Sequence, residues 1–197
     1  MRQMLIYGDS NVYGQGNYLL GEGRMNEDAQ WPRLLEKKLG ANWRVLAEGL
    51  PGRVAGQFLR LESFKNGRGD IFKAVLLSST PLDFILIALG TNDLMPEHKR
   101  TPDEILADLL WFKRIGEAAQ PEAVLAFLEP SAMELADPHA ELAEQKRLEL
   151  IAKMHESGLR CISLPRLPLS DGVHFTAEAA GRVAELVYYW LEDRSLV

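Results

Sequence analysis

The sequence predicts a doubly wound α/β fold, in which helices cover both faces of a parallel sheet. Short apolar segments alternate with longer segments of helical periodicity along the 197 residues. The segment DFILIALG at 83–90 is a continuous apolar run closed by a glycine, which is typical of a strand buried on both faces. No repeat, linker or low-complexity tract interrupts this alternation, so we expect one domain over residues 1–197.

The predicted elements alternate as strand and helix from one end of the chain to the other. Five strands are expected, at residues 3–7, 43–47, 83–89, 123–128 and 159–164. Five helices are expected, at residues 30–39, 70–79, 102–119, 138–157 and 177–193. Right-handed crossovers between parallel strands place helices on both sides, so the expected architecture is a three-layer α/β/α fold around a five-stranded parallel sheet.

Two of the expected helices have clear start signals. Thr101 is an N-cap residue, Pro102 suits the first turn, and Glu104 completes a capping box. Asp137 and Pro138 repeat the cap and the proline without the glutamate.

Composition and charge narrow the classes of partner. Hydrophobic residues make up 47% of the chain and charged residues 25%, as in ordinary globular proteins, and the formal net charge is −6. An acidic surface repels nucleic acid and anionic membranes, so we expect neither as a partner. No apolar run reaches the roughly 18 residues of a membrane helix. With Cys161 as the only cysteine and only two residues before the first strand, we expect no disulfide, no signal peptide and a cytoplasmic location.

The chemistry-bearing segments follow the predicted strands. In an open parallel sheet, the site lies outside the carboxyl ends of the strands, near the point where the strand order reverses. The segments expected at that edge are 8–10, 48–53, 90–93 and 170–174.

Ser10 is the candidate nucleophile at this edge, because it directly follows the first strand. Serine needs a base within hydrogen-bond reach and a third group that orients the base. His174 follows Asp171 by three residues in SDGVHFT, so one loop can carry both groups. Taken alone, the same loop is also typical of an Asx-turn and a helix cap. The other histidines, in charged, proline-flanked or helical contexts, are expected at the surface: His98, His139 and His155.

Three candidate donors could stabilise a developing oxyanion. The side-chain amide of Asn92 follows the most apolar strand, Gly52 offers an unobstructed backbone N–H, and the N–H of Ser10 is the third. The segments GTND and PG are also typical of ordinary turns. Their joint placement at one sheet edge favours a site.

Four short motifs, taken in order, resemble the four blocks of the SGNH (GDSL-type) hydrolases. They are Gly8-Asp9-Ser10, Gly52, Gly90-x-Asn92-Asp93 and Asp171-x-x-His174. The likeness spans residues 5–191, and the segments EGLPGR, ALGTNDL, RTPDEI and DGVHFT are most similar to the arylesterase and acyltransferase-like branch. The resemblance implies a flavodoxin-like three-layer fold and hydrolysis of esters or thioesters with neither a metal nor an organic cofactor.

The resemblance also implies a role for each matched residue. Ser10 is expected to be the nucleophile, His174 the general base and then acid, and Asp171 the carboxylate that orients it. An oxyanion hole is expected from Ser10, Gly52 and Asn92. Supporting roles in turn hydrogen bonds and loop positioning are expected for two further residues, Asp9 and Asp93.

The chain departs from the family pattern beside the nucleophile. Leu or Ile and Thr often follow Gly-Asp-Ser in this family, whereas Asn11, Val12 and Tyr13 follow it here. We therefore expect Asn11 to make the acyl pocket less apolar or to contact a polar substrate. Val173 is expected either to line the acyl pocket or simply to pack in its loop.

The predicted function is a serine esterase that hydrolyses, or transfers the acyl group of, small carboxylic esters. The alternatives are a carbohydrate O-acetylesterase, a lysophospholipase or thioesterase, and a catalytically inert binding module of the same fold. The chain lacks the Gly-x-Ser-x-Gly elbow of the α/β-hydrolases, a P-loop, dinucleotide glycine spacing and metal-ligand histidine spacing. Tyr188, Tyr189 and Trp190 cannot all face one core, so one of them is expected in a contact between copies of the chain or partly exposed in a monomer.

Overall fold

A five-stranded parallel sheet forms the centre of the computed structural model, which describes residues 1–58, 60–136 and 138–197. The strand order is β2-β1-β3-β4-β5, and every neighbouring pair is parallel. The strands are β1 (Arg2–Gly8), β2 (Trp43–Gly49), β3 (Phe84–Ala88), β4 (Val124–Leu128) and β5 (Cys161–Ile162). The predicted doubly wound fold is confirmed. The strand order reverses between β1 and β3, so a crevice is expected outside the carboxyl ends of these two strands.

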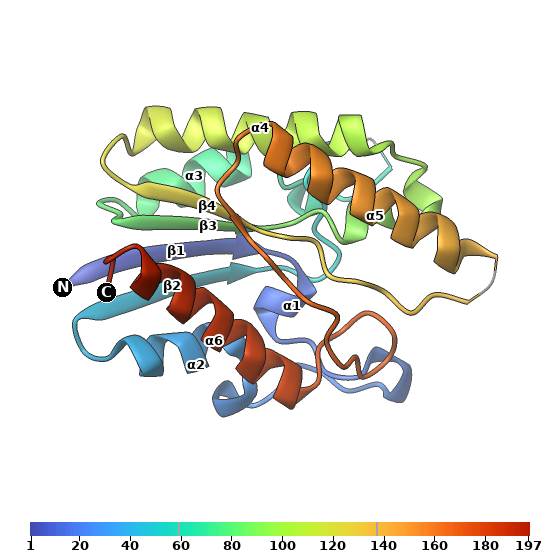
Figure 1. Ribbon diagram of the computed structural model, residues 1–197, viewed down its shortest axis with the longest axis horizontal. Coiled ribbons are helices and arrows are strands. Elements are labelled where there is room, and N and C mark those ends of the chain that lie inside the picture. The colour runs from blue at the N-terminus through green and yellow to red at the C-terminus, as the bar shows by residue number, and fades with distance from the viewer. Residues whose placement is uncertain (59, 137) are drawn as a thin grey trace.

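Helices cover both faces of the sheet and make three layers (Figure 1). Helices α2 and α6 lie on one face, and α3, α4 and α5 lie on the other. The helices are α1 (Ser10–Tyr13), α2 (Trp31–Leu39), α3 (Asp70–Ser78), α4 (Pro102–Ala119), α5 (His139–Glu156) and α6 (Ala177–Asp193). Short 3-10 helices occupy the connections: η1 (Tyr18–Leu20), η2 (Glu27–Ala29), η3 (Ser63–Lys65), η4 (Asn92–Leu94) and η5 (Pro96–His98).

Strand β1 shows how the sequence builds two cores. Successive side chains of a strand point to opposite faces of the sheet. Met4 and Ile6 therefore pack in the core between the sheet and the helices α2 and α6. Leu5 and Tyr7 pack in the core between the sheet and the helices α3, α4 and α5. All four side chains are fully buried, which explains why this strand reads as a continuous apolar run.

The predicted element boundaries hold closely except at the last strand. β5 covers only Cys161–Ile162 rather than the predicted 159–164, because only these two residues pair with β4, opposite Phe127 and Leu128. The capping box of α4 is confirmed: the Glu104 N–H donates to Thr101 Oγ1, and the Thr101 N–H donates to Glu104 Oε2. The predicted cap at Asp137 lies outside the described residues.

No helix within the described part of the chain is both long and apolar enough to cross a bilayer.

Candidate active site

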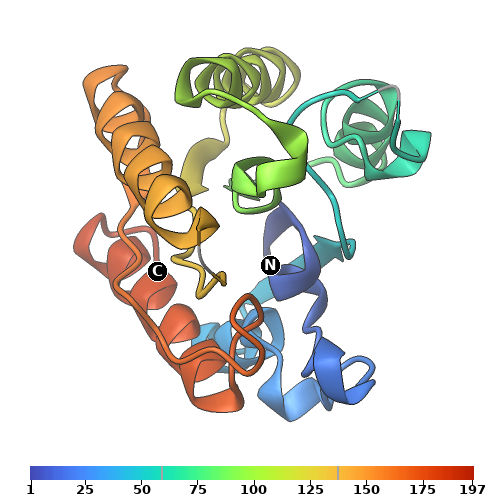
Figure 2. The same ribbon diagram turned by 90° about the vertical axis from the view of Figure 1, so that its right-hand side faces the viewer.

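Ser10 stands where β1 ends and the short helix α1 begins. The Asp9 carboxylate accepts a hydrogen bond from the Asn11 N–H at 2.9 Å and caps α1. α1 ends at Gly14, whose left-handed φ of 84° favours glycine. This single turn presents Ser10 at the carboxyl edge of the sheet, which faces the viewer in Figure 2.

Small residues on the neighbouring strands make room for α1. Gly8 pairs in register with Gly49 of β2 and Ala88 of β3. A Cβ atom on Gly49 would lie 2.1 Å from the backbone nitrogen of Tyr13, and one on Gly8 would lie 2.3 Å from a methyl carbon of Val12. The glycines at the ends of β1 and β2 therefore allow the turn that carries Ser10 to pack directly against the sheet.

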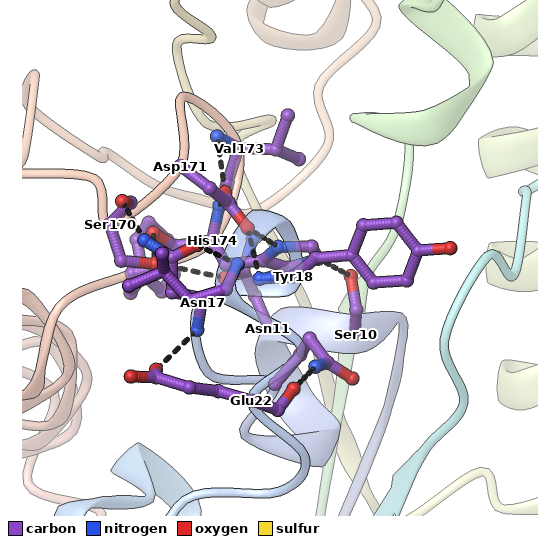
Figure 3. Close-up of polar contacts among 12 residues, drawn as sticks. Ser10, Asn11, Asn17, Tyr18, Glu22, Ser170, Asp171, Val173 and His174 are labelled. Atoms are coloured by element: carbon purple, nitrogen blue, oxygen red, sulfur yellow. Dashed lines mark hydrogen bonds and ion pairs between the residues drawn. The ribbon is translucent and has the colours of Figure 1, made fainter.

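A chain of hydrogen bonds joins Ser10 to the loop that follows β5. His174 Nε2 lies 3.1 Å from Ser10 Oγ, and His174 Nδ1 lies 2.7 Å from Asp171 Oδ2 (Figure 3). An ionised carboxylate can only accept, so Nδ1 carries the ring proton and Nε2 is left to accept the Ser10 hydroxyl proton. The structure thus brings together the three residues predicted from opposite ends of the chain.

Asp171 accepts four hydrogen bonds and is held ionised. Besides the His174 ring, its donors are the backbone N–H groups of His174, Val173 and Tyr18, at 2.9, 3.1 and 2.8 Å. Burial by itself would raise the pKa of Asp171, but the hydrogen bonds from His174, Tyr18 and Val173 outweigh it and lower the pKa to about 2. The carboxylate is therefore charged throughout the physiological pH range and can orient the imidazole.

The three predicted oxyanion-hole residues line the same cavity as the triad. Asn92 opens η4 directly after the β3 edge, and its side-chain amide donates one hydrogen bond to the Arg53 carbonyl at 2.9 Å. The second N–H of that amide makes no hydrogen bond within the part of the chain that the structure describes. Neither the Ser10 N–H nor the Gly52 N–H has a hydrogen-bond partner among the described residues. Gly52 has a left-handed φ of 74°, which only glycine adopts without strain.

The cavity has a volume of about 330 Å³ and a mostly apolar wall. Tyr18 and Leu19 come from η1, a segment of which three consecutive residues (Tyr18, Leu19 and Leu20) are more than 70% exposed. The lining residues are Ser10, Gln15, Tyr18, Leu19, Pro51, Gly52, Asn92, Met95, Asp171, Val173 and His174. Val173 thus lies at the cavity wall, which is the first of the two positions predicted for it. The η1 residues and Met95 were not assigned to the cavity wall from the sequence. A run of apolar residues in a loop rich in Gly and Asn could have indicated an exposed apolar surface at η1.

Asp93 links the segment that follows Gly52 to the turn that carries Asn92. It is fully buried and accepts hydrogen bonds from the N–H groups of Ala55 and Gly56 and from Arg100 Nη1, at 2.7, 3.3 and 2.7 Å. Burial raises the pKa of Asp93 despite these partners. The carboxylate therefore joins the backbone of Ala55 and Gly56 to η4.

Arg53 is a buried support that sequence reasoning did not identify. Its Nη1 donates to the carbonyls of Gly8, at 2.8 Å, and Glu48, so it joins the ends of β1 and β2. The guanidinium lies over the Tyr7 ring, 4.1 Å from its centroid. Burial lowers the pKa of Arg53 from its ordinary value. Arginine in the turn EGLPGR looks solvent-facing in sequence, so only the packing reveals it.

Asn11 takes a position different from the one predicted for it. Its side chain is 9% exposed and does not line the cavity around Ser10. Nδ2 donates to the Val173 carbonyl, and Oδ1 accepts from the Phe175 N–H. The side chain of Asn11 therefore binds the loop that carries His174.

The other histidines do not line this cavity. His155 Nε2 lies 2.7 Å from the buried carboxylate of Glu129, and the ring of His98 stacks against Phe58. Within the described residues, no group of three or more His, Cys, Asp or Glu side chains could hold a metal ion.

Comparisons with known proteins find related structures. The aryl esterase of M. smegmatis is 24% identical at a TM-score of 0.83, with 100% of both chains covered. A carbohydrate acetylesterase family member from Sinorhizobium meliloti is 25% identical at a TM-score of 0.79, with 100% of this chain and 99% of that chain covered. A lipolytic protein of the G-D-S-L family from Desulfitobacterium hafniense is 15% identical at 0.68, with 97% and 100% covered. No protein-family model and no curated protein sequence matches the chain.

Proposed function

We propose that this chain, which has the SGNH hydrolase fold, is a carboxylic ester hydrolase that forms an acyl-enzyme on Ser10. One observation carries the proposal: an unbroken hydrogen-bond path from Ser10 Oγ through the His174 ring to Asp171, along the wall of an open cavity. A serine, a base within reach and an orienting carboxylate are the parts that nucleophilic acyl transfer requires.

The first half of the reaction forms the acyl-enzyme. Ser10 Oγ attacks the ester carbonyl carbon while His174 Nε2 takes the hydroxyl proton, and the carbonyl π electrons move to the oxygen. The Ser10 and Gly52 N–H groups and the Asn92 amide donate hydrogen bonds to that oxyanion. The intermediate then collapses, the C–O bond to the alcohol breaks, and His174 gives its proton to the leaving oxygen.

The second half releases the acyl group. Water enters in place of the alcohol, His174 removes its proton, and the hydroxide oxygen attacks the acyl carbon. Collapse of the second tetrahedral intermediate breaks the bond to Ser10 Oγ, which recovers its proton from His174. If a small alcohol takes the place of water, it accepts the acyl group and a new ester is released. Asp171 stays ionised throughout and stabilises the imidazolium that forms twice in each cycle.

The cavity wall favours small uncharged esters with an apolar part. Leu19, Pro51, Met95 and Val173 offer hydrocarbon surface, and the volume of about 330 Å³ is at the small end for a ligand pocket. A sugar needs several polar partners, whereas outside the proposed machinery the wall offers only two polar side chains, Gln15 and Tyr18, and the Gln15 amide nitrogen already donates to the Glu22 carbonyl. We therefore rank a carbohydrate acetylesterase second.

Replacing the nucleophile tests the proposal. In Ser10→Ala, we expect hydrolysis of p-nitrophenyl acetate to fall by about 10⁴-fold or more, because the covalent route is lost. The assay follows p-nitrophenolate release at equal protein concentration, and circular dichroism checks that the fold is retained. Undiminished activity in this variant would remove Ser10 from the mechanism.

A covalent probe separates an enzyme from an inert binding module. A fluorophosphonate should label wild-type protein once, and mass spectrometry should place the adduct on Ser10 and find none in Ser10→Ala. A well-folded wild type that neither takes the label nor hydrolyses any ester would support the binding module.

Substrate profiling tests the preference for small apolar esters. For p-nitrophenyl esters from acetate to octanoate, we expect kcat/KM to be highest among the short acyl groups, because the cavity is small. Acetylated sugars should be poorer substrates than phenyl acetate. Faster release of acetate from the sugars would favour the carbohydrate acetylesterase instead.

A further inference from the structure

We propose that Asn11 is a positioning residue that fixes the His174 ring relative to Ser10, an inference that rests on the proposed function. Asn11 directly follows the nucleophile in α1 and is nearly buried. Its side chain does not line the cavity around Ser10, and its hydrogen bonds go to the backbone on either side of His174, so its role is exerted through that backbone.

The side chain of Asn11 forms hydrogen bonds with the loop on both sides of His174. Its Nδ2 donates to the Val173 carbonyl at 3.3 Å, and its Oδ1 accepts from the Phe175 N–H at 3.0 Å. These two backbone groups belong to the residues immediately before and after His174. One planar amide therefore holds the segment that carries the proposed base, and Figure 3 shows Asn11 lying between Ser10 and that loop.

The loop depends on such contacts for its place in the molecule. Its internal hydrogen bonds, from the Ser170 N–H to the His174 carbonyl at 2.8 Å and from the Val173 and His174 N–H groups to Asp171, set its shape. They do not set its distance from Ser10. Two other side-chain or backbone links reach the loop from the N-terminal segment, Asn17 Nδ2 to the Ser170 carbonyl and the Tyr18 N–H to Asp171. Both attach at residues 170–171 and start at least seven residues from Ser10.

Asn11 provides the shortest path between nucleophile and base. Ser10 and Asn11 are adjacent in one helical turn, and the Asn11 N–H is itself fixed by the Asp9 carboxylate. One side chain, that of Asn11, therefore connects the backbone beside Ser10 to the backbone beside His174, whose Nε2 lies 3.1 Å from Ser10 Oγ. Asparagine suits the task because its amide donates and accepts at once, whereas aspartate lacks the donor and leucine lacks both.

The test separates turnover from binding and from folding. Asn11→Leu keeps the approximate volume and removes both hydrogen bonds, and Asn11→Asp keeps only the acceptor. Active sites are counted by end-point labelling with a fluorophosphonate, and kcat and KM for p-nitrophenyl acetate are then measured per labelled site. We expect kcat to fall by about 100-fold in Asn11→Leu, because a small misplacement of a reacting group has this effect. KM should stay within about threefold, because Asn11 itself does not line the cavity.

Asn11→Asp should lose at least about tenfold in kcat, since its carboxylate faces the Val173 carbonyl without a proton to donate. This variant keeps the inference testable if Asn11→Leu does not fold.

Asn66 supplies a matched control. Its side chain makes the same two-sided pairing with a backbone, accepting from the Phe58 N–H at 2.7 Å and donating to the Phe58 carbonyl at 3.3 Å, with no contact to the triad. Asn66→Leu should lower the melting temperature and leave kcat per labelled site within about threefold of wild type. This comparison shows what the loss of a merely structural amide does.

The outcomes distinguish the two proposals. An active wild type together with an equally active Asn11→Leu, per labelled site, would overturn the positioning role alone. A loss in Asn66→Leu as large as that in Asn11→Leu would overturn it too. A folded wild type without ester hydrolysis or label would overturn the proposed function and this inference with it.

Discussion

Two aspartates in the site show how the surroundings of a residue decide its charge. Asp171 receives four hydrogen bonds, and its pKa falls to about 2. Asp9 is fully enclosed with a backbone hydrogen bond from Asn11, and burial raises its pKa to about 6, partly offset by that bond and by the nearby charges of His174 and Arg53. Sequence motifs identified both residues, but the difference between them depends on donors from distant segments such as Tyr18.

The pH dependence of stability tests the burial of Asp9. Between pH 3.8, its ordinary pKa, and about pH 6, folded Asp9 holds a proton that the unfolded chain releases. The free energy of unfolding therefore falls as the pH rises through this window. Asp9→Asn removes this term, so the stability of the variant relative to wild type should increase by about 3 kcal/mol between pH 3 and pH 7. Urea unfolding at several pH values measures this difference.

The exposed Asp28 provides the comparison for this titration. Asp28→Asn should keep the wild-type pH dependence. If Asp9→Asn follows the wild-type curve across the same window, Asp9 is ionised in the folded protein without cost.

At the residue scale, sequence reasoning found side chains that act through a motif and missed those that act through packing. Ser10, Asp171 and His174 were predictable because strand ends and loop spacing place them at one edge. Asn11 was recognised as unusual but was assigned to the substrate, since a sequence does not show which backbone groups lie opposite an amide. The buried Arg53 gave no signal, because a Pro-Gly turn normally faces water.

At the element scale, the long helices and buried strands were predictable, and the short turns around the site were not. A four-residue helix such as α1 is too short to show a helical period. Its place follows instead from the small residues on neighbouring strands, of which Gly49 approaches the backbone nitrogen of Tyr13 most closely. The geometry of the nucleophile turn is thus encoded partly in β2, about 40 residues away.

This close packing predicts a strong effect of one methyl group. In Gly49→Ala, the new Cβ would lie 2.1 Å from a backbone atom that cannot move alone. The free energy of unfolding should fall by about 3 kcal/mol. Because α1 must shift, hydrolysis of p-nitrophenyl acetate should fall as well. Urea unfolding and the ester assay measure both effects.

Gly181→Ala is the matched control. Gly181 lies within α6, and nothing lies within 4 Å of the position that its Cβ would take. The substitution should raise the free energy of unfolding by about 1 kcal/mol through helix propensity and leave hydrolysis unchanged. Equal stability of Gly49→Ala and wild type would show that α1 can shift away from β2 at little cost in free energy.

At the scale of the whole molecule, the topology followed from the order of elements. Alternating strands and helices with right-handed crossovers leave few arrangements, and the observed order β2-β1-β3-β4-β5 is one of them. The length of β5 could not be predicted, because the sequence does not show that only Cys161 and Ile162 lie opposite residues of β4. The cavity wall could not be predicted either, since it joins η1, the turn after β2 and the loop after β3.

The hydrogen bond between Ser10 and His174 joins residues 164 positions apart. A ribosome adding about 5–20 residues per second makes the proposed nucleophile roughly 8–33 s before it makes the proposed base. Throughout that interval Ser10 is an ordinary serine, with the weak reactivity of any alcohol. The order of synthesis therefore delays the proposed acyl chemistry until all five strands have been made. The appearance of esterase activity would show that the newly made chain has folded.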